Sequence, residues 1–328
     1  MTAQPYDSLT PDTVIDAVES LGYLSDLRIF PLNSYENRVY QIGIENADPL
    51  IAKFYRPGRW RDEEIQEEHS FSLALHELDV PLIPPMQIEN ETLFRFKEHR
   101  FALYPRRGGH APELDNLDTL FNLAQHLGRL HQYGKARVFE HRPTIDIQSF
   151  AIDSRSFLLE NNFIPNTLLP AYESVTQHVI EKLQAIFKAW PAETIRLHGD
   201  CHPGNIIQRD ENLYLVDLDD CRNGPAIQDL WMLLSGDRFQ RSEQLECILE
   251  GYEEFCEFNM RELHLIEALR SMRLMHYAAW LARRWQDPAF PQAFPWFNTE
   301  RYWSEHVLEL REQLAALEEE SLKPANWV

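Results

Sequence analysis

Hydrophobic and polar residues alternate in two different ways along the chain, and the change divides it into two parts. Over the first hundred or so residues, short apolar runs are separated by turn residues, which is typical of strands. A helix is predicted before them, because Thr10 can cap it, Pro11 suits its first position and Gly22 ends the apolar stripe. The expected strands are Asp26 to Pro31, Arg38 to Ile44, Leu50 to Tyr55, Met86 to Ile88, Leu93 to Phe96 and Arg100 to Tyr104.

One longer segment of the first part, Arg61 to Leu78, has the helical period, and its apolar residues share a face. Glu64 and Glu68 fall on that same face, while Lys53 lies inside the third expected strand. A buried charge seldom occurs without a partner of opposite sign. We therefore expect Lys53 to pair with Glu68, and Glu64 is the alternative partner.

The strand pattern ends at Pro105-Arg106-Arg107-Gly108-Gly109, and from Leu117 onward the apolar spacing is mostly helical. We place a hinge there and predict an α+β chain of two lobes, residues 1–104 and residues 105–328. The second lobe is predicted to be larger and mainly helical. Its expected helices are Leu120 to His131, Leu168 to Trp190, Ser242 to Phe258, Met260 to Trp285 and Glu300 to Glu320, with an ordered loop from Asp287 to Phe297.

The stretch RLHGDCHPGNIIQRDENLYLVDLDD, residues 196–220, carries the candidate chemistry. Asp200 and Asn205 stand on either side of a Pro-Gly turn, which can bring both side chains to one side of a loop. An apolar run from Leu213 to Val216 predicts a buried strand. Asp217 and Asp219 lie two residues apart on that strand, so we expect both to point to the same face.

Phosphoryl transfer needs such a set of side chains. One carboxylate accepts the proton of the attacking hydroxyl, while an amide oxygen and a second carboxylate hold Mg²⁺ against the phosphates. Asp200 fits the first role, and Asn205 with Asp217 fits the second. The same residues could instead form an ordinary polar loop before a strand, but the ordered set favours catalysis.

Two further readings of nearby residues are weaker. His198 and His202 form His-x-Asp-x-His with Asp200, but a two-metal hydrolase needs ligands on other strand ends, and no second Asp-x-His occurs. The turn LNSYEN contains no glycine, and there Ser34 could offer its hydroxyl and backbone N–H to a phosphate. The alternative for Ser34 is a plain hairpin turn.

Composition narrows the partners and the compartment. The 328 residues carry a net charge of −21, which disfavours nucleic acid and anionic membrane surfaces as partners and would weakly attract cationic substrates. Acidity can also serve solubility alone. The four cysteines form no C-x-x-C pair, the start MTAQPYDSLT lacks a signal-peptide pattern, and no apolar run approaches a membrane span. We therefore expect no zinc site, no disulfide framework and a cytoplasmic location.

The 196–220 stretch resembles the catalytic centre of the protein-kinase-like fold in the form used by aminoglycoside and choline kinases. A narrower resemblance, carried by LNSYENRVY, KFYRPGRW, HGDCHPGN, VDLDDCRNGPAIQDLWMLL and DPAFP, is to the bacterial stress response kinase A (RdoA) family of serine/threonine protein kinases. It implies a bilobal fold with an N-terminal antiparallel sheet plus helix. It also implies that Asp229 hydrogen-bonds back to the catalytic loop.

The resemblance assigns roles to the candidate residues. Asp200 is the implied proton acceptor, Asn205 and Asp217 the implied Mg²⁺ ligands, and Ser34 and Lys53 members of the ATP site, with Glu68 expected to orient the lysine. We thus expect a monomeric ATP- and Mg²⁺-dependent kinase acting on protein Ser/Thr hydroxyls. Two alternatives stay open: a kinase of a small amino alcohol, aminoglycoside or sugar, and a non-catalytic nucleotide-binding scaffold.

Overall fold

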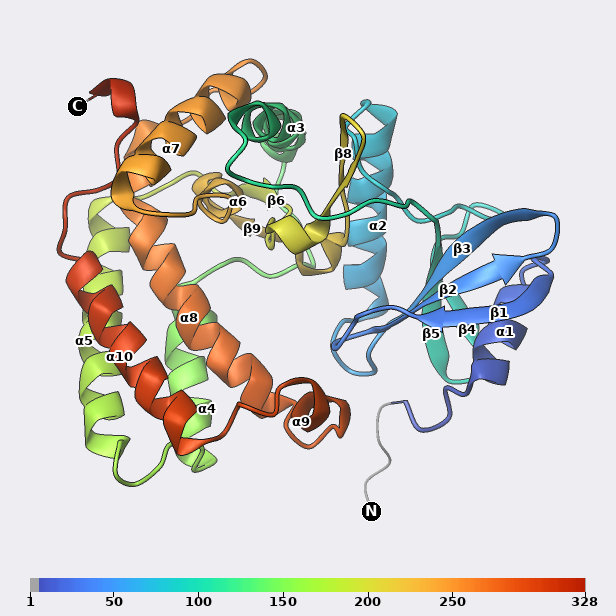
Figure 1. The fold of residues 1–328 in the computed structure, drawn as a ribbon, viewed down its shortest axis with the longest axis horizontal. Coiled ribbons are helices and arrows are strands. Elements are labelled where there is room, and N and C mark those ends of the chain that lie inside the picture. The colour runs from blue at the N-terminus through green and yellow to red at the C-terminus, as the bar shows by residue number, and fades with distance from the viewer. Residues whose placement is uncertain (1–5, 328) are drawn as a thin grey trace. The chain divides into compact units, whose positions relative to one another are not determined.

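The structure is a computed structural model that describes residues 6–327, so the first five residues of the N-terminal segment lie outside it. The chain forms two units (Figure 1). The lobe boundary expected after residue 104 stays a prediction. Unit 1 comprises Met1–Pro112, Phe139–Arg142 and His202–Cys221, and unit 2 comprises Glu113–Val138, Pro143–Cys201 and Arg222–Val328.

Unit 1 is built on an antiparallel sheet, as expected for its alternating apolar runs. Within the described residues it has five strands in the order β1-β2-β3-β5-β4. The strand β3 lies between β2 and β5, so both of its edges are hydrogen-bonded and its centre is buried. The strands are β1 (Ser25–Pro31), β2 (Arg38–Ile44), β3 (Ala47–Phe54), β4 (Phe94–Phe96) and β5 (His99–Pro105).

In the part of unit 1 that the structure describes, the α-helices are α1 (Pro11–Glu19) and α2 (Asp62–Glu77). The Thr10 hydroxyl caps α1 by accepting a hydrogen bond from the Thr13 N–H, which confirms the predicted start. Val14 and Val18 of α1 enter one apolar core with Ile42 of the sheet. The apolar stripe of α1 is therefore what holds it against the sheet.

The hairpin of β7 (Ile206–Arg209) and β8 (Asn212–Leu215) is attached to unit 1 through its backbone. Leu215 accepts a hydrogen bond from Ile83 N–H and donates one to the Pro81 carbonyl, at 3.1 and 2.9 Å. On the other edge, Gln208 and His110 exchange two backbone hydrogen bonds of 3.0 and 2.8 Å. The candidate metal ligands thus stand on a hairpin fixed to the unit that carries Lys53.

Unit 2 is mainly helical, with α8 at its centre: α8 packs against α4, α5, α6 and α10 (Figure 1). A short antiparallel pair, β6 (Ile195–Leu197) and β9 (Arg222–Gly224), completes it. The helices are α3 (Leu117–Gly134), α4 (Asp153–Glu160), α5 (Leu169–Ala189), α6 (Ile227–Trp231), α7 (Arg238–Glu253), α8 (Ile266–Arg283), α9 (Ala289–Ala293) and α10 (Glu300–Ala316).

Three sequence predictions about elements were wrong. Met86 to Ile88 forms no ladder, because Pro84 and Pro85 precede it without N–H donors and positive φ angles follow at residues 89 and 90. The helix expected from Met260 starts as a 3₁₀ segment and becomes α8 only at Ile266. The expected loop after Asp287 contains the short helix α9.

No helix among residues 6–327 combines the length and the apolar character needed to cross a membrane. The four cysteines, at positions 201, 221, 247 and 256, are free thiols.

Two adjacent glycines in the segment between β5 and α3 give a test of this packing. A methyl group on Gly109 would lie 2.4 Å from the Gln208 carbonyl oxygen, whereas one on Gly108 would meet only the Arg106 side chain, at 3.7 Å or more. We expect Gly109→Ala to lower the free energy of unfolding by about 1–3 kcal/mol. Gly108→Ala, the control, should change it by no more than about 0.5 kcal/mol. Urea unfolding of both variants would check this, and equal effects would contradict the close approach.

Candidate active site

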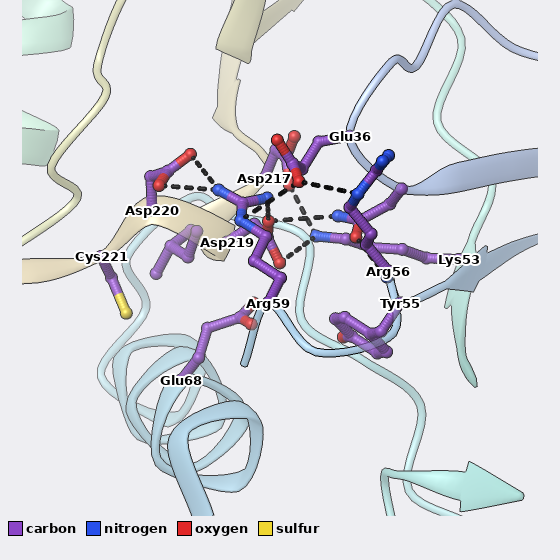
Figure 2. A network of polar contacts seen from close by, with 12 residues as sticks. Glu36, Lys53, Tyr55, Arg56, Arg59, Glu68, Asp217, Asp219, Asp220 and Cys221 are labelled. Carbon is purple, nitrogen blue, oxygen red and sulfur yellow. Dashed lines mark hydrogen bonds and ion pairs between the residues drawn. The ribbon is translucent and has the colours of Figure 1, made fainter. Parts of the chain in front are cut away.

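Lys53 lies in the middle of the unit 1 sheet, where burial requires its charge to be paired. It stands on β3 opposite Val39 and Ala102, and only 6% of its surface is exposed. Its ammonium lies 2.7 Å from Asp217 Oδ1 and 3.3 Å from Asp219 Oδ1 (Figure 2). Burial by itself lowers the pKa of Lys53, but the two carboxylates outweigh it and raise that pKa well above its usual value. The lysine is therefore a fixed positive charge.

The two aspartates follow β8 and do not continue it, so the prediction that they share a strand face was wrong. The strand ends at Leu215, Asp217 has a left-handed φ of 59°, and Leu218–Asp220 form a 3₁₀ turn. Aspartate tolerates that conformation better than most residues. The turn still directs both carboxylates to Lys53, but their environments differ. The Asp217 side chain is 51% exposed and that of Asp219 is 4% exposed.

The Asp219 carboxylate is the centre of the network in Figure 2. It accepts hydrogen bonds from Asn37 Nδ2, at 3.1 Å, and from Arg59 Nη1, and it faces Lys53. Arg59 also binds both carboxylate oxygens of Asp220 at 2.8 Å. Burial disfavours ionisation of Asp219, but Arg59 and Lys53 outweigh burial and lower its pKa to about 2.

Sequence reasoning missed Asn37, Arg59 and Asp219 as members of this network. The available signal was small: Arg59 follows Lys53 by six residues in a Pro-Gly turn, and Asn37 ends the LNSYEN turn. Both turns bring a polar side chain back over the end of the sheet, where Asp219 lies. A turn residue that binds a distant carboxylate leaves no periodic trace in the sequence.

Asn205 is placed beside Asp217 by backbone hydrogen bonds. Its carbonyl accepts from the Val216 N–H at 3.0 Å, and Val216 immediately precedes Asp217. His202 Nδ1 accepts from the Gly204 N–H at 3.0 Å and so caps the 3₁₀ turn that ends at Asn205. Among the described residues no group of three His, Cys, Asp or Glu side chains is arranged for a metal ion. His202 has a structural contact within the loop.

The three glutamates of α2 have separate tasks. Glu64 accepts from the Arg61 N–H at 2.6 Å and caps the helix. Glu67 accepts three backbone hydrogen bonds of 2.7–2.9 Å from residues 140–142. Glu68 is buried, and its Oε2 lies 3.9 Å from Arg142 Nη2. In the described part of the chain, the ion pairs of Lys53 go to Asp217 and Asp219, so the expected pair with Glu68 or Glu64 is not formed.

Glu68 still contributes to the field at Lys53. Burial raises the pKa of Glu68 to about 7, although Lys53 and Arg142 pull it down. Among the described residues its ion pair, with Arg142 at 3.9 Å, is longer than those of Asp219, so Glu68 is the less well compensated acid. Arg142 donates hydrogen bonds to the Asp219 carbonyl oxygen at 2.6 Å and to Cys221 Sγ at 3.2 Å. Any role of Glu68 toward a nucleotide remains a prediction.

Ser34 closes the turn between β1 and β2. Its hydroxyl accepts a hydrogen bond from the Val39 N–H at 3.0 Å and lies 3.3 Å from the Leu32 carbonyl. This geometry suits the plain hairpin turn that the sequence left open. A phosphate contact of Ser34 remains a prediction.

Asp200 belongs to unit 2, in the loop that follows β6. The backbone of this loop is fixed by Asp229, whose carboxylate accepts from the N–H groups of His198 and Gly199, both at 2.8 Å. This confirms the hydrogen bond expected from Asp229. Gly199 has a φ of 86°, which explains the glycine there. Arg273, which the sequence did not single out, lies 2.5 Å from the Asp200 carboxylate.

Comparisons with known proteins agree with this arrangement. The phosphotransferase enzyme family matches residues 28–266. Stress response kinase A of Escherichia coli (strain K12) is 45% identical over 322 residues, which is 98% of each chain. Serine/threonine protein kinase RdoA of Salmonella typhimurium (strain LT2) is 44% identical over 97% of this chain and 96% of its own.

Solved structures share the fold at low identity. One is the amicoumacin kinase hAmiN in complex with AMP-PNP, Ca²⁺ and Ami, with a TM-score of 0.72, 18% identity, and coverage of 92% of this chain and 91% of that one. Another is the choline kinase LicA from Streptococcus pneumoniae, with a TM-score of 0.63, 16% identity, and coverage of 93% and 98%. They confirm the predicted fold class, an antiparallel N-terminal sheet followed by a helical C-terminal part.

Asp219 and Asp220 provide a matched pair for testing the network, since both bind Arg59 but only Asp219 is buried. Asp219→Asn should lower the free energy of unfolding at pH 7 by about 3–5 kcal/mol, because it leaves buried cations less well compensated. Asp220→Asn should cost about 1 kcal/mol or less. Urea unfolding would measure both losses, and equal losses would contradict the central role of Asp219.

The low pKa of Asp219 predicts that the stability of the folded protein depends on pH. The folded pKa of Asp219 is about 2, below its ordinary 3.8. Its contribution is therefore complete above pH 3.8 and is lost as the pH falls toward about 2. The difference in stability between wild type and Asp219→Asn should shrink over that window.

Proposed function

The chain belongs to the phosphotransferase enzyme family, and we propose that it is an ATP- and Mg²⁺-dependent kinase of serine and threonine hydroxyls in proteins. The observation that carries the proposal is the 2.7 Å contact of buried Lys53 with half-exposed Asp217, beside Asn205. The near full-length relatives named stress response kinase A, and the one named a serine/threonine protein kinase, support the acceptor class.

Unit 1 would supply the nucleotide contacts. Lys53 would hold the α- and β-phosphates, and Ser34 would offer its hydroxyl to a phosphate, with Glu68 adding to the field at Lys53. Asn205 and Asp217 would hold the metal ion. An amide oxygen and one accessible carboxylate suit Mg²⁺, which keeps waters and substrate phosphates as its other ligands. When bound, Mg²⁺ neutralises charge on the phosphates.

Asp200 would act on the acceptor. The acceptor oxygen attacks the γ-phosphorus, a new P–O bond forms, and the bond to the β-phosphate oxygen breaks to release ADP. The hydroxyl proton passes to the Asp200 carboxylate, which also orients the hydroxyl. The proposed proton acceptor Asp200 and the proposed metal ligand Asn205 are five residues apart in the sequence, so one short segment would supply both roles.

The two alternatives predict different results in one experiment. Purified protein is given γ-labelled ATP with a cell extract and, separately, with a panel of amino alcohols, aminoglycosides and sugars. A protein kinase labels extract proteins on Ser or Thr. A small-molecule kinase, as choline kinase LicA is named, labels only the panel. A scaffold labels neither, although it would have no reason to keep Lys53, Asp200, Asn205 and Asp217.

A cytoplasmic location and a monomeric state are further parts of the proposal.

Asp200→Asn should lower kcat for protein phosphorylation by about 10²–10⁴-fold, since it removes the proton acceptor. The amide keeps the shape of the side chain and an oxygen for Arg273, so the fold should persist. The dissociation constant for ATP should barely change, because the nucleotide contacts lie elsewhere. Transfer kinetics and nucleotide binding on a variant with a normal melting curve would check this. Wild-type turnover, or a loss confined to ATP affinity, would contradict the role.

Lys53→Ala should reduce kcat/KM for ATP by about 10²–10³-fold, because it removes a pre-organised cation. Lys53→Arg should restore it only in part, since a planar guanidinium does not fit where a point charge is held. Lys97→Ala, which changes an exposed lysine of the same unit, is the control. Steady-state kinetics at varied ATP would measure all three. Full activity of Lys53→Arg would show that position 53 needs charge alone.

A further inference from the structure

The contact between Arg273 and Asp200 places a permanent cation at the proposed base. Arg273 Nη1 lies 2.5 Å from Asp200 Oδ1, and both residues belong to unit 2. Arg273 comes from α8, and Asp200 from the loop whose backbone Asp229 fixes. Neither partner is therefore on a segment that is held only by this contact.

Arg273 retains binding capacity beyond this contact. A guanidinium has five N–H donors, cannot be deprotonated in proteins and binds carboxylates through two parallel hydrogen bonds. Within the described residues Arg273 donates only to Asp200, and its side chain is 39% exposed. The remaining donors can reach an anionic group on a molecule whose hydroxyl lies at Asp200.

The same face of α8 continues with groups suited to a peptide. Tyr277, Trp280 and Arg284 follow Arg273 at spacings of four, three and four residues, so the four side chains share a face about 16 Å long. The Tyr277 and Trp280 rings stack at 5.7 Å, and the Arg284 guanidinium lies 5.2 Å from the Trp280 ring centre. Trp280 also packs edge-on against Phe290 and Phe294, so Tyr277 is the exposed aromatic side chain of this face. Aromatic and arginine side chains are the types that dominate peptide and protein recognition.

The charge of this helix is opposite to that of the chain. The chain has a net charge of −21, but α8 contains one acidic residue, Glu267, and three arginines, at positions 270, 273 and 283. A cationic amino alcohol placed at Asp200 would meet Arg273 and be repelled. An acceptor with a carboxylate beside its hydroxyl would be attracted, because complementary charges set specificity.

We propose that Arg273 is the acceptor-recognition residue, and that the acceptor is a peptide segment in which acidic residues flank the reacting serine or threonine. One N–H of Arg273 holds Asp200, while its remaining donors bind the flanking carboxylate. Arg284 extends the cationic surface along α8. This inference rests on the proposed function of Asp200 and adds the chemical class of the acceptor.

The test uses the full chain, γ-labelled ATP and two synthetic peptides that each contain one serine. In one peptide the residues on either side of the serine are Asp and Glu, and in the other they are Lys and Arg. Wild type should have the higher kcat/KM for the acidic peptide. Arg273→Gln should lower that value by about 10–100-fold, mostly through KM, because a charged hydrogen-bonded contact is lost. It should change the value for the basic peptide much less. Arg273→Lys, which keeps the charge without the fork, should recover part of the loss.

Arg283→Gln is the matched control, because it removes one arginine from the same helix, ten residues from Arg273, and the Arg283 guanidinium lies over the Phe157 ring at 5.1 Å. It should leave the ratio of the two peptides unchanged. The inference is overturned if wild type prefers the basic peptide, or if Arg273→Gln lowers kcat equally for both peptides with the ratio intact. If wild type labels both peptides equally, the inference alone fails. If wild type labels no peptide or extract protein but labels a small alcohol, the proposed function fails with it.

Discussion

The burial of the Asp219 charge is the constraint on which the organisation of unit 1 depends. A carboxylate taken out of water is tolerated only if cations and hydrogen-bond donors surround it. Here those groups come from three separate segments: Asn37 from the turn before β2, Lys53 from β3 and Arg59 from the loop after β3. One carboxylate therefore fixes two turns and a strand relative to the hairpin that carries Asn205.

The same constraint explains the arrangement around Lys53. Asp219 remains ionised to about pH 2, whereas Glu68 has a pKa of about 7, so Asp219 is the stronger partner at neutral pH. Both acids are buried, and what separates them is the supply of cations. Among the described residues, Asp219 has Arg59 and Lys53 at ion-pair distance, whereas the ion pair of Glu68 is with Arg142, at 3.9 Å. Burial alone would have raised both pKa values.

The sequence predicted what periodicity and local chemistry encode. The strand pattern identified β1, β2, β3 and β5, and the helical pattern identified α2, because each has a repeating buried face. It failed where a single dihedral or a distant contact decides the result. No residue pattern announces the left-handed φ of Asp217, which follows the end of the strand. Arg59 and Arg273 each bind an aspartate that is distant in the sequence, by 160 and 73 residues, so no local pattern marks them.

Both units use the same physical division between a buried and an accessible acid. In unit 1, buried Asp219 anchors the DLDD turn, and Asp217 is half exposed, as its proposed role as a metal ligand requires. In unit 2, fully buried Asp229 holds the loop N–H groups, and Asp200 is more accessible, as its proposed role toward an acceptor requires. A carboxylate that is to bind a ligand must stay accessible, even where it pairs with a lysine or an arginine as Asp217 and Asp200 do. A buried neighbouring acid can meanwhile hold the backbone, so a fixed loop and an accessible carboxylate occur together.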